Sequence, residues 1–203
     1  MTTSLILASL LASATAFAPV SQQASSTALK AFESELGSQP PLGFFDPLGL
    51  LADANQERFD RLRYVELKHG RVCQLAFLGQ ITTRAGVHLP GSIDNAGDSF
   101  DSFPDGWAGL SAIPQAGLFQ IIAFVGFLEL FVMKDSANGA APGDFVGDFR
   151  NGSLDFGWDK FDEDEKMSKR AIELNNGRAA MMGILGLMIH EQLGTDLPII
   201  GQL

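Results

Sequence analysis

The chain of 203 residues suits a single domain once a leader segment is subtracted. Its formal net charge of −10 argues against a nucleic-acid partner, because contacts to phosphates need clustered Lys and Arg. The single cysteine, Cys73, excludes an intramolecular disulfide and a cysteine-based metal cluster.

The first 30 residues have the features of a presequence rather than of a folded segment. Residues 1–16 are largely apolar but too short to span a membrane, and the small residues Ala14 and Ala16 resemble a signal cleavage site. Residues 17–30 are rich in Ser and contain no Asp or Glu, as is typical of organelle transit peptides. A signal-like part followed by a transit-like part indicates a plastid that is entered through the secretory route.

Three stretches of the remaining chain, 31–203, are predicted to be helical. From about 57 to 87, apolar residues recur at helical spacing without a proline. The stretch from about 110 to 134 includes the most apolar part of the chain, where Glu129 is the single charge, and it has the length of about 20 residues that a span needs. A third helical pattern runs from about 165 to 193, and polar, Gly-rich loops separate the three.

Hydropathy alone identifies the middle helix as a membrane span. The mean hydropathy of +0.13 fits a rich soluble core as well as a membrane protein with polar loops. The uncharged runs of the outer helices, 72–83 and 179–190, each cover about half of a bilayer. These helices can therefore cross a membrane only if the charges nearer their N-termini are buried together with partners.

An internal repeat supplies such partners. The segment that starts at Arg63 reads RYVELKHGRVCQLAFLG, and the segment that starts at Arg170 reads RAIELNNGRAAMMGILG. At an offset of 107 residues the two share Arg63/Arg170, Glu66/Glu173, Leu67/Leu174, Gly70/Gly177, Arg71/Arg178, Leu78/Leu185 and Gly79/Gly186. The first and third of three alternating spans run in the same direction, so a two-fold axis along the membrane normal can relate the copies.

The repeat predicts that charges pair between the helices. Glu66 and Arg71 are five residues apart, a spacing that is poorly suited to a pair within one helix. Across the axis, Glu66 can meet Arg178 while Glu173 meets Arg71. This pairing would neutralise four charges that cost roughly 2.5–3.5 kcal/mol each at mid-membrane. A glycine before each arginine would let the backbones approach closely. The alternative is two soluble amphipathic helices with solvated charges.

Each copy of the repeat also carries candidate ligands for a metal. His69 follows Glu66 by three residues, Asn176 follows Glu173 by three, and positions i and i+3 share a helix face. Magnesium in chlorophyll takes four ring nitrogens and one axial donor, which His, Asn, Gln or Glu can supply. A Glu-x-x-His motif is also half of a di-iron helix-bundle site, but that site needs two such motifs and two further carboxylates.

Other polar side chains at membrane depth are functional candidates by default. They are Gln115, Gln120 and Glu129 on the middle helix and His190 near the end of the third. The alternatives are hydrogen bonds between helices for the glutamines and an interfacial position for His190. His88 and Tyr64 are interpreted as ordinary surface or interface residues.

At these residues the chain resembles the light-harvesting chlorophyll-binding superfamily, and within it the fucoxanthin–chlorophyll a/c proteins of diatoms and related algae. The resemblance rests on the paired signatures ELKHGR at 66–71 and ELNNGR at 173–178, together with AFESELGSQPPLGFFDPLGL from Ala31 and ATAFAP at 14–19. It implies an all-α membrane protein whose residues 31–203 form a chlorophyll-binding domain. Of its three transmembrane helices, the first and third would be related by a pseudo-two-fold axis and cross each other.

The resemblance implies a role for each candidate residue. Glu66, His69, Glu173 and Asn176 would be axial ligands of chlorophyll magnesium, with Arg71 and Arg178 as their cross-pairing partners. His190 stands where plant members have a ligating Gln. On the middle helix, Gln120 and Glu129 are nine residues apart where plant members have a Gln and a Glu eight apart, which fits Glu129 better than Gln120. The loops FDPLG at 45–49 and DFGWD at 155–159 resemble those that hold carotenoid head groups.

The implied function is that of a light-harvesting antenna without bond chemistry, in a multi-pass protein of the plastid thylakoid membrane. Its cofactors would be chlorophyll a, chlorophyll c, fucoxanthin and a further carotenoid of the diadinoxanthin type. Its partners would be thylakoid lipids, other antenna subunits in an oligomer and a photosystem core. The alternatives are a photoprotective relative that dissipates energy, and a membrane scaffold without pigments, which would leave His69 and Asn176 without a purpose.

Overall fold

The computed structural model describes residues 32–52, 55–133, 146–148 and 157–194. The predicted presequence and the first two residues of the DFGWD loop lie outside this part of the chain. Within it, the regular structure is helical apart from two isolated β-bridges, Gln39–Gly43 and Ser92–Ser99.

The first long helix, α3, comprises Gln56–Arg84. It begins where the Asn55 side chain accepts a hydrogen bond from the backbone N–H of Arg58, which satisfies one of the unpaired donors of the first turn. The helix ends before residue 87, the expected end, because the chain turns at Gly86, whose φ of 75° is costly for residues that carry a Cβ. At about 1.5 Å per residue, its 29 residues extend about 44 Å.

The last helix, α6, comprises Glu163–Leu193 and, like α3, has a side-chain cap at its start and a glycine after its end. The Asp162 side chain accepts from the N–H of Glu165, and three acidic residues in the first turn favour the positive end of the helix dipole. Gly194 ends the helix in the left-handed conformation. Both α3 and α6 are therefore longer than the roughly 30 Å hydrocarbon core of a membrane.

The middle stretch differs from the single helix expected over 110–134. It consists of α4 (Trp107–Ala112), α5 (Gln115–Phe127) and a π-helical turn, η3 (Leu128–Val132). The expectation of one helix is wrong at Pro114, which has no N–H to donate and which disfavours helical geometry in the residue before it. Ile113 is accordingly extended, with φ −63° and ψ 131°.

One helix in the described part of the chain, Gln115–Val132, is both long and apolar enough to cross a membrane by length and composition. Its side chains are not buried within the chain. Large apolar side chains are exposed on α3 and α6 as well, among them Leu75, Leu78 and Met182. Exposed apolar surface of this extent is typical of proteins that face lipid or hold large apolar ligands.

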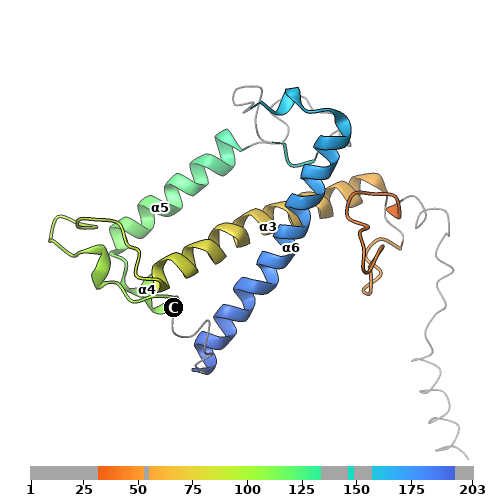
Figure 1. The fold of residues 1–203 in the computed structure, drawn as a ribbon. Helices are drawn as coiled ribbons and strands as arrows, with labels where there is room; N and C mark the ends of the chain where they lie inside the picture. The colour runs from red at the N-terminus through yellow and green to blue at the C-terminus, as the bar shows by residue number, and fades with distance from the viewer. Residues whose placement is uncertain (1–31, 53–54, 134–145, 149–156, 195–203) are drawn as a thin grey trace, which may run out of the picture.

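The main helix packing is between α3 and α6, which cross each other, whereas α5 continues directly into η3 (Figure 1). The buried residues along the crossing are Leu67, Leu174, Ala180 and Leu187. A second small cluster forms at the start of α3, where the rings of Phe32 and Phe59 stack with centroids 4.5 Å apart.

The two helices touch at a pair of glycines. A Cβ added to Gly70 would lie 3.0 Å from the Cα of Gly177, and the reverse substitution gives the same distance. Gly70 and Gly177 are equivalent positions of the repeat, so the crossing point lies where a two-fold axis would pass.

Enlarging Gly177 should separate the helices. We expect Gly177→Val to lower the free energy of unfolding by about 1–3 kcal/mol or more, because the added side chain meets backbone that cannot move aside. Gly186→Val is the matched control, since a Cβ there meets no atom within 4 Å and the change in helix propensity is the same. Thermal unfolding in detergent, followed by circular dichroism, measures both. Equal losses would contradict the close contact.

Candidate functional site

Two reciprocal ion pairs join α3 and α6 on either side of the glycine contact. Nε of Arg178 lies 2.7 Å from Oε1 of Glu66, and Nε of Arg71 lies 2.6 Å from Oε1 of Glu173. The cross-pairing predicted from the repeat is therefore confirmed. The glutamates are 27% and 31% exposed and the arginines 40% and 29%, so the pairs are partly shielded from the surrounding medium.

Each arginine also holds a loop against the helices. Arg178 donates through Nη1 to the carbonyl of Gly37 at 3.0 Å, and Arg71 donates through Nη1 to the carbonyl of Gly147 at 2.8 Å. The planar guanidinium suits this task because its donors form a rigid fork. The ion pairs thereby connect the segments before α3 and before α6 to the helix crossing.

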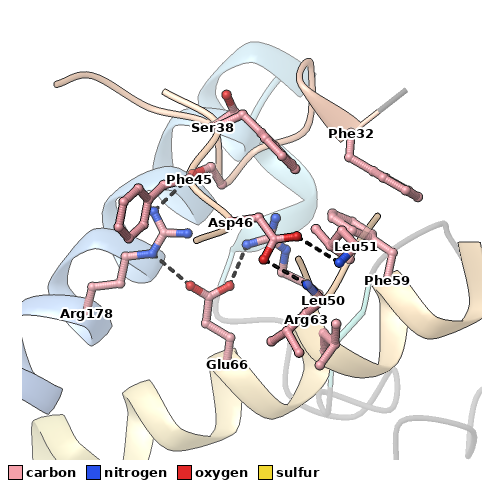
Figure 2. Close-up of a pocket in the computed structure, with 13 residues that line it drawn as sticks. Phe32, Ser38, Phe45, Asp46, Leu50, Leu51, Phe59, Arg63, Glu66 and Arg178 are labelled. Carbon is pink, nitrogen blue, oxygen red and sulfur yellow. Dashed lines mark hydrogen bonds and ion pairs between the residues drawn. The ribbon is translucent and has the colours of Figure 1, made fainter. Parts of the chain in front are cut away.

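Arg63 adds a contact that the sequence analysis missed. Its Nη1 lies 2.8 Å from Oε2 of Glu66, so both oxygens of this carboxylate accept from arginines (Figure 2). The sequence does contain evidence for this contact, because Arg63 precedes Glu66 by three residues, a spacing that brings side chains together on a helix. Each carboxylate oxygen has two lone pairs and can therefore still donate one to a metal.

A cavity of about 260 Å³ lies beside the Glu66–Arg178 pair. Aromatic side chains line it, with Phe32 and Phe59 on one side and Phe45 near the guanidinium of Arg178 (Figure 2). Phe45 belongs to the FDPLG loop, and Asp46 fixes the shape of this loop. The carboxylate of Asp46 accepts from the N–H groups of Leu50 at 3.0 Å and Leu51 at 2.8 Å.

The remaining candidates on the repeat, His69 and Asn176, are exposed on the surfaces of α3 and α6. Nδ1 of His69 lies 2.8 Å from the carbonyl oxygen of Val65. Because a carbonyl only accepts, Nδ1 carries the proton and Nε2 has the lone pair that a metal needs.

No group of three or more His, Cys, Asp or Glu side chains that could hold a bare metal ion occurs among the described residues. A di-iron centre requires such a group, and both repeat glutamates are instead engaged by arginines. The candidate donors act singly, which suits a metal that already has four ligands of its own.

Glu129 on η3 contacts the ammonium group of Lys68 on α3. Lys68 could not be found as this partner from the sequence, because nothing in the chain order predicts this approach. Gln120 on α5 is exposed. The π-helical turn that contains Glu129 has more residues per turn than an α-helix. Gln120 and Glu129 therefore differ in direction around the helix axis from two residues nine apart in a straight α-helix.

A further junction forms at the C-terminal ends of α3 and α6. Nη2 of Arg84 lies 3.2 Å from Oε2 of Glu191, and the N–H of Trp107 donates to Oε1 of Glu191 at 2.8 Å. One carboxylate thus joins α3, α6 and the start of α4. This junction was missed from the sequence, although Arg84 and Glu191 are 107 residues apart, which is the offset of the repeat.

Comparison with known proteins identifies the family to which this arrangement belongs. The family described as chlorophyll A-B binding protein matches residues 32–192. The chain belongs to this family. The resemblance carried by the two ELxxGR signatures is thereby confirmed.

Relatives within the chlorophyll-binding family cover almost the whole chain. The chloroplastic fucoxanthin-chlorophyll a-c binding protein of Trieres chinensis is 71% identical over 204 residues, which cover 98% of this chain and 99% of that protein. The chloroplastic fucoxanthin-chlorophyll a-c binding protein A of Phaeodactylum tricornutum is 62% identical, over 95% of this chain and 97% of its own length. The chloroplastic fucoxanthin-chlorophyll a-c binding protein B of Macrocystis pyrifera is 55% identical, over 90% of this chain and 83% of its own length.

Exchanging the charges of the Arg71–Glu173 pair tests its electrostatic role. Arg71→Glu alone should lower the free energy of unfolding by roughly 1–3 kcal/mol, because it leaves two partly shielded carboxylates facing each other. Adding Glu173→Arg should recover most of this loss in the double variant. Thermal unfolding in detergent provides the comparison, and a double variant no more stable than the single one would contradict the pairing. Lys166→Leu, which removes an ion pair whose carboxylate, Glu163, is 80% exposed, should change little.

Proposed function

We propose that this chain is a light-harvesting antenna protein that binds chlorophyll a, chlorophyll c and fucoxanthin and passes excitation energy to a photosystem. The names of its relatives support these pigment classes and a chloroplast location. The observation that carries the proposal is the arrangement of α3 and α6, whose charges are paired at the crossing while metal-donor side chains and apolar side chains are exposed. No bond is made or broken in this function.

The proposal includes three membrane-spanning helices in a multi-pass thylakoid protein. The segment Gln115–Val132 has the composition of a span. α3 and α6 have the length, and their reciprocal ion pairs remove most of the cost of placing four charges in the membrane. A two-fold axis along the membrane normal through Gly70 and Gly177 would relate α3 to α6. Residues 1–30 would be the presequence that directs the chain to the plastid.

Single side chains would hold the chlorophylls as axial ligands of magnesium. On α3 these are Glu66 and His69, and on α6 they are Glu173, Asn176 and His190. On the middle helix they are Glu129 and Gln120. The fit is good because each repeat carboxylate keeps lone pairs beside its arginine, and because exposed apolar side chains such as Val72 and Ile172 surround the donors. Bound chlorophylls supply absorption and energy transfer, while the chain sets their spacing and surroundings.

Carotenoids would bind with their polar ends at the two loops. The FDPLG loop borders the aromatic cavity beside Arg178, which has room and a hydrogen-bonding rim for a polar head group. In the described end of the second loop, the Trp158 ring packs edge-on against Phe161 at 6.1 Å. Fucoxanthin and a carotenoid of the diadinoxanthin type suit such sites, which combine a polar end with apolar surface. Lipids and other antenna subunits would cover the rest of the apolar surface.

Fluorescence excitation tests the antenna role. In protein purified from its native membrane, excitation bands of chlorophyll c and of a green-absorbing carotenoid should appear when chlorophyll a emission is detected. This result requires the pigments to be held close enough for energy transfer. Absorption by these pigments without matching excitation bands would instead favour an energy-dissipating relative, which the names of the relatives do not favour. A protein without pigment would overturn the proposal.

Substituting His69 tests one ligand. His69→Leu should lose one chlorophyll per polypeptide and keep the fold, because the exposed ring contributes little to packing while its Nε2 would ligate magnesium. His69→Gln is the control, since an amide oxygen can take the axial position. Pigment extraction and counting after reconstitution measure the difference. An unchanged count in His69→Leu would remove His69 from the ligand set.

A further inference from the structure

A second, larger cavity of about 600 Å³ lies at the C-terminal end of α3. Its walls come from the last turns of α3, the segment from Val87 to Gly106, α4 and the beginning of α5. Apolar side chains dominate the lining, among them Leu89, Phe100 and Ile121. The volume lies within the range of roughly 300–1,000 Å³ that is usual for cofactor sites.

His88 lines this cavity and is held by a carboxylate from outside it. Nδ1 of His88 lies 3.0 Å from Oδ1 of Asp101, which belongs to the short helix η2 (Phe100–Ser102). The His88 side chain is 21% exposed, whereas the Asp101 side chain is 78% exposed. The imidazole is thus enclosed while its carboxylate partner is in contact with solvent.

The contact with Asp101 decides which nitrogen of His88 can act as a donor. A carboxylate accepts a hydrogen bond, so in the neutral imidazole Nδ1 carries the proton and Nε2 has the lone pair. Among the described residues, no hydrogen bond to Nε2 competes for it. Histidines that bind metals usually donate their other ring N–H to a carboxylate or carbonyl, which fixes the ring and raises its basicity.

The other polar side chains of the cavity are engaged elsewhere or solvated. Thr83 donates to the carbonyl of Gly79 at 3.2 Å, and Gln80 accepts from Nε of Arg84 at 3.1 Å. Asp105 is exposed at the rim. Among the polar side chains that line the cavity, His88 is therefore the one whose ring nitrogen is available to bind a metal centre.

Local contacts preform the loop that carries this site. Oδ1 of Asp94 accepts from three successive N–H groups at 3.0–3.1 Å, those of Ala96, Gly97 and Asp98. Ser92 and Ser99 form a β-bridge, which closes the loop before η2. The carboxylate of Glu191 holds the start of α4 against the ends of α3 and α6. A ligand would therefore meet a cavity whose walls are already ordered.

We propose that Nε2 of His88 is the axial ligand of a further chlorophyll, held in this cavity outside the α3–α6 repeat. The inference rests on the proposed function, because the ligand class is the magnesium tetrapyrrole of the antenna. The apolar side chains of the cavity would lie against the ring, and Asp101 orients the donor. From the sequence, His88 is an ordinary surface or interface residue, because its carboxylate partner and its cavity appear only in the fold.

Reconstitution with chlorophyll a, chlorophyll c and fucoxanthin tests this site. We compare the full chain with His88→Leu and His88→Gln, and count each pigment per polypeptide after extraction. His88→Leu should bind one chlorophyll fewer and lose a matching band in the absorption difference spectrum. His88→Gln should keep the count, because its amide oxygen can replace Nε2, and the band should shift.

The outcomes separate this inference from the proposed function. An unchanged chlorophyll count in His88→Leu would overturn the His88 site while leaving the antenna role intact. A loss of several pigments in both variants would overturn it too, because His88 would then support the loop through Asp101 rather than ligate a metal. Failure of the unaltered chain to bind chlorophyll would instead overturn the proposed function.

Discussion

The pairing of Glu66 with Arg178 and of Glu173 with Arg71 is the interaction on which the other features depend. Four charges near the middle of two long helices are costly in an apolar medium unless each meets its opposite. Reciprocal pairing meets this requirement for both helices at once, and it works only at one crossing point and one register. The contact between Gly70 and Gly177 brings the backbones close enough for the side chains to reach. The same arginines then fix the loops at Gly37 and Gly147.

In the part of the chain that the structure describes, few apolar side chains are buried beyond this crossing. Its buried apolar residues follow the contact of α3 with α6 and the Phe32–Phe59 stack, while much of the apolar surface of α3, α5 and α6 is exposed. The proposed pigments and lipid would cover that surface. Ligands that bind only the folded chain stabilise it by mass action, so bound pigments would act as structural elements as well as chromophores.

Two carboxylates of the α3–α6 pair each organise more than one segment. Near the crossing, Glu66 accepts from Arg63 and Arg178 next to the aromatic cavity (Figure 2). At the C-terminal ends of the helices, Glu191 accepts from Arg84 and from the first N–H of α4, next to the larger apolar cavity. The Glu66–Arg178 pair lines its cavity directly, whereas Glu191 holds α4, whose Gly109 and Leu110 line the second cavity. The paired carboxylates thus lie beside both candidate sites.

The pairing of α3 with α6 could be predicted from the sequence, because the internal repeat places the paired residues at equivalent positions of the two helices. Identical Glu, Gly and Arg positions in two helical segments determine which charges must meet, and the ELxxGR signatures determine the family. Pro114 was also visible, yet its break was missed because the hydropathy of the stretch is continuous across it. Only the tertiary structure decided the partners that lie far apart in the chain, such as Lys68 with Glu129 and His88 with Asp101. Such pairs depend on where irregular loops and a separate helix come to lie in space. No period in the sequence encodes that placement.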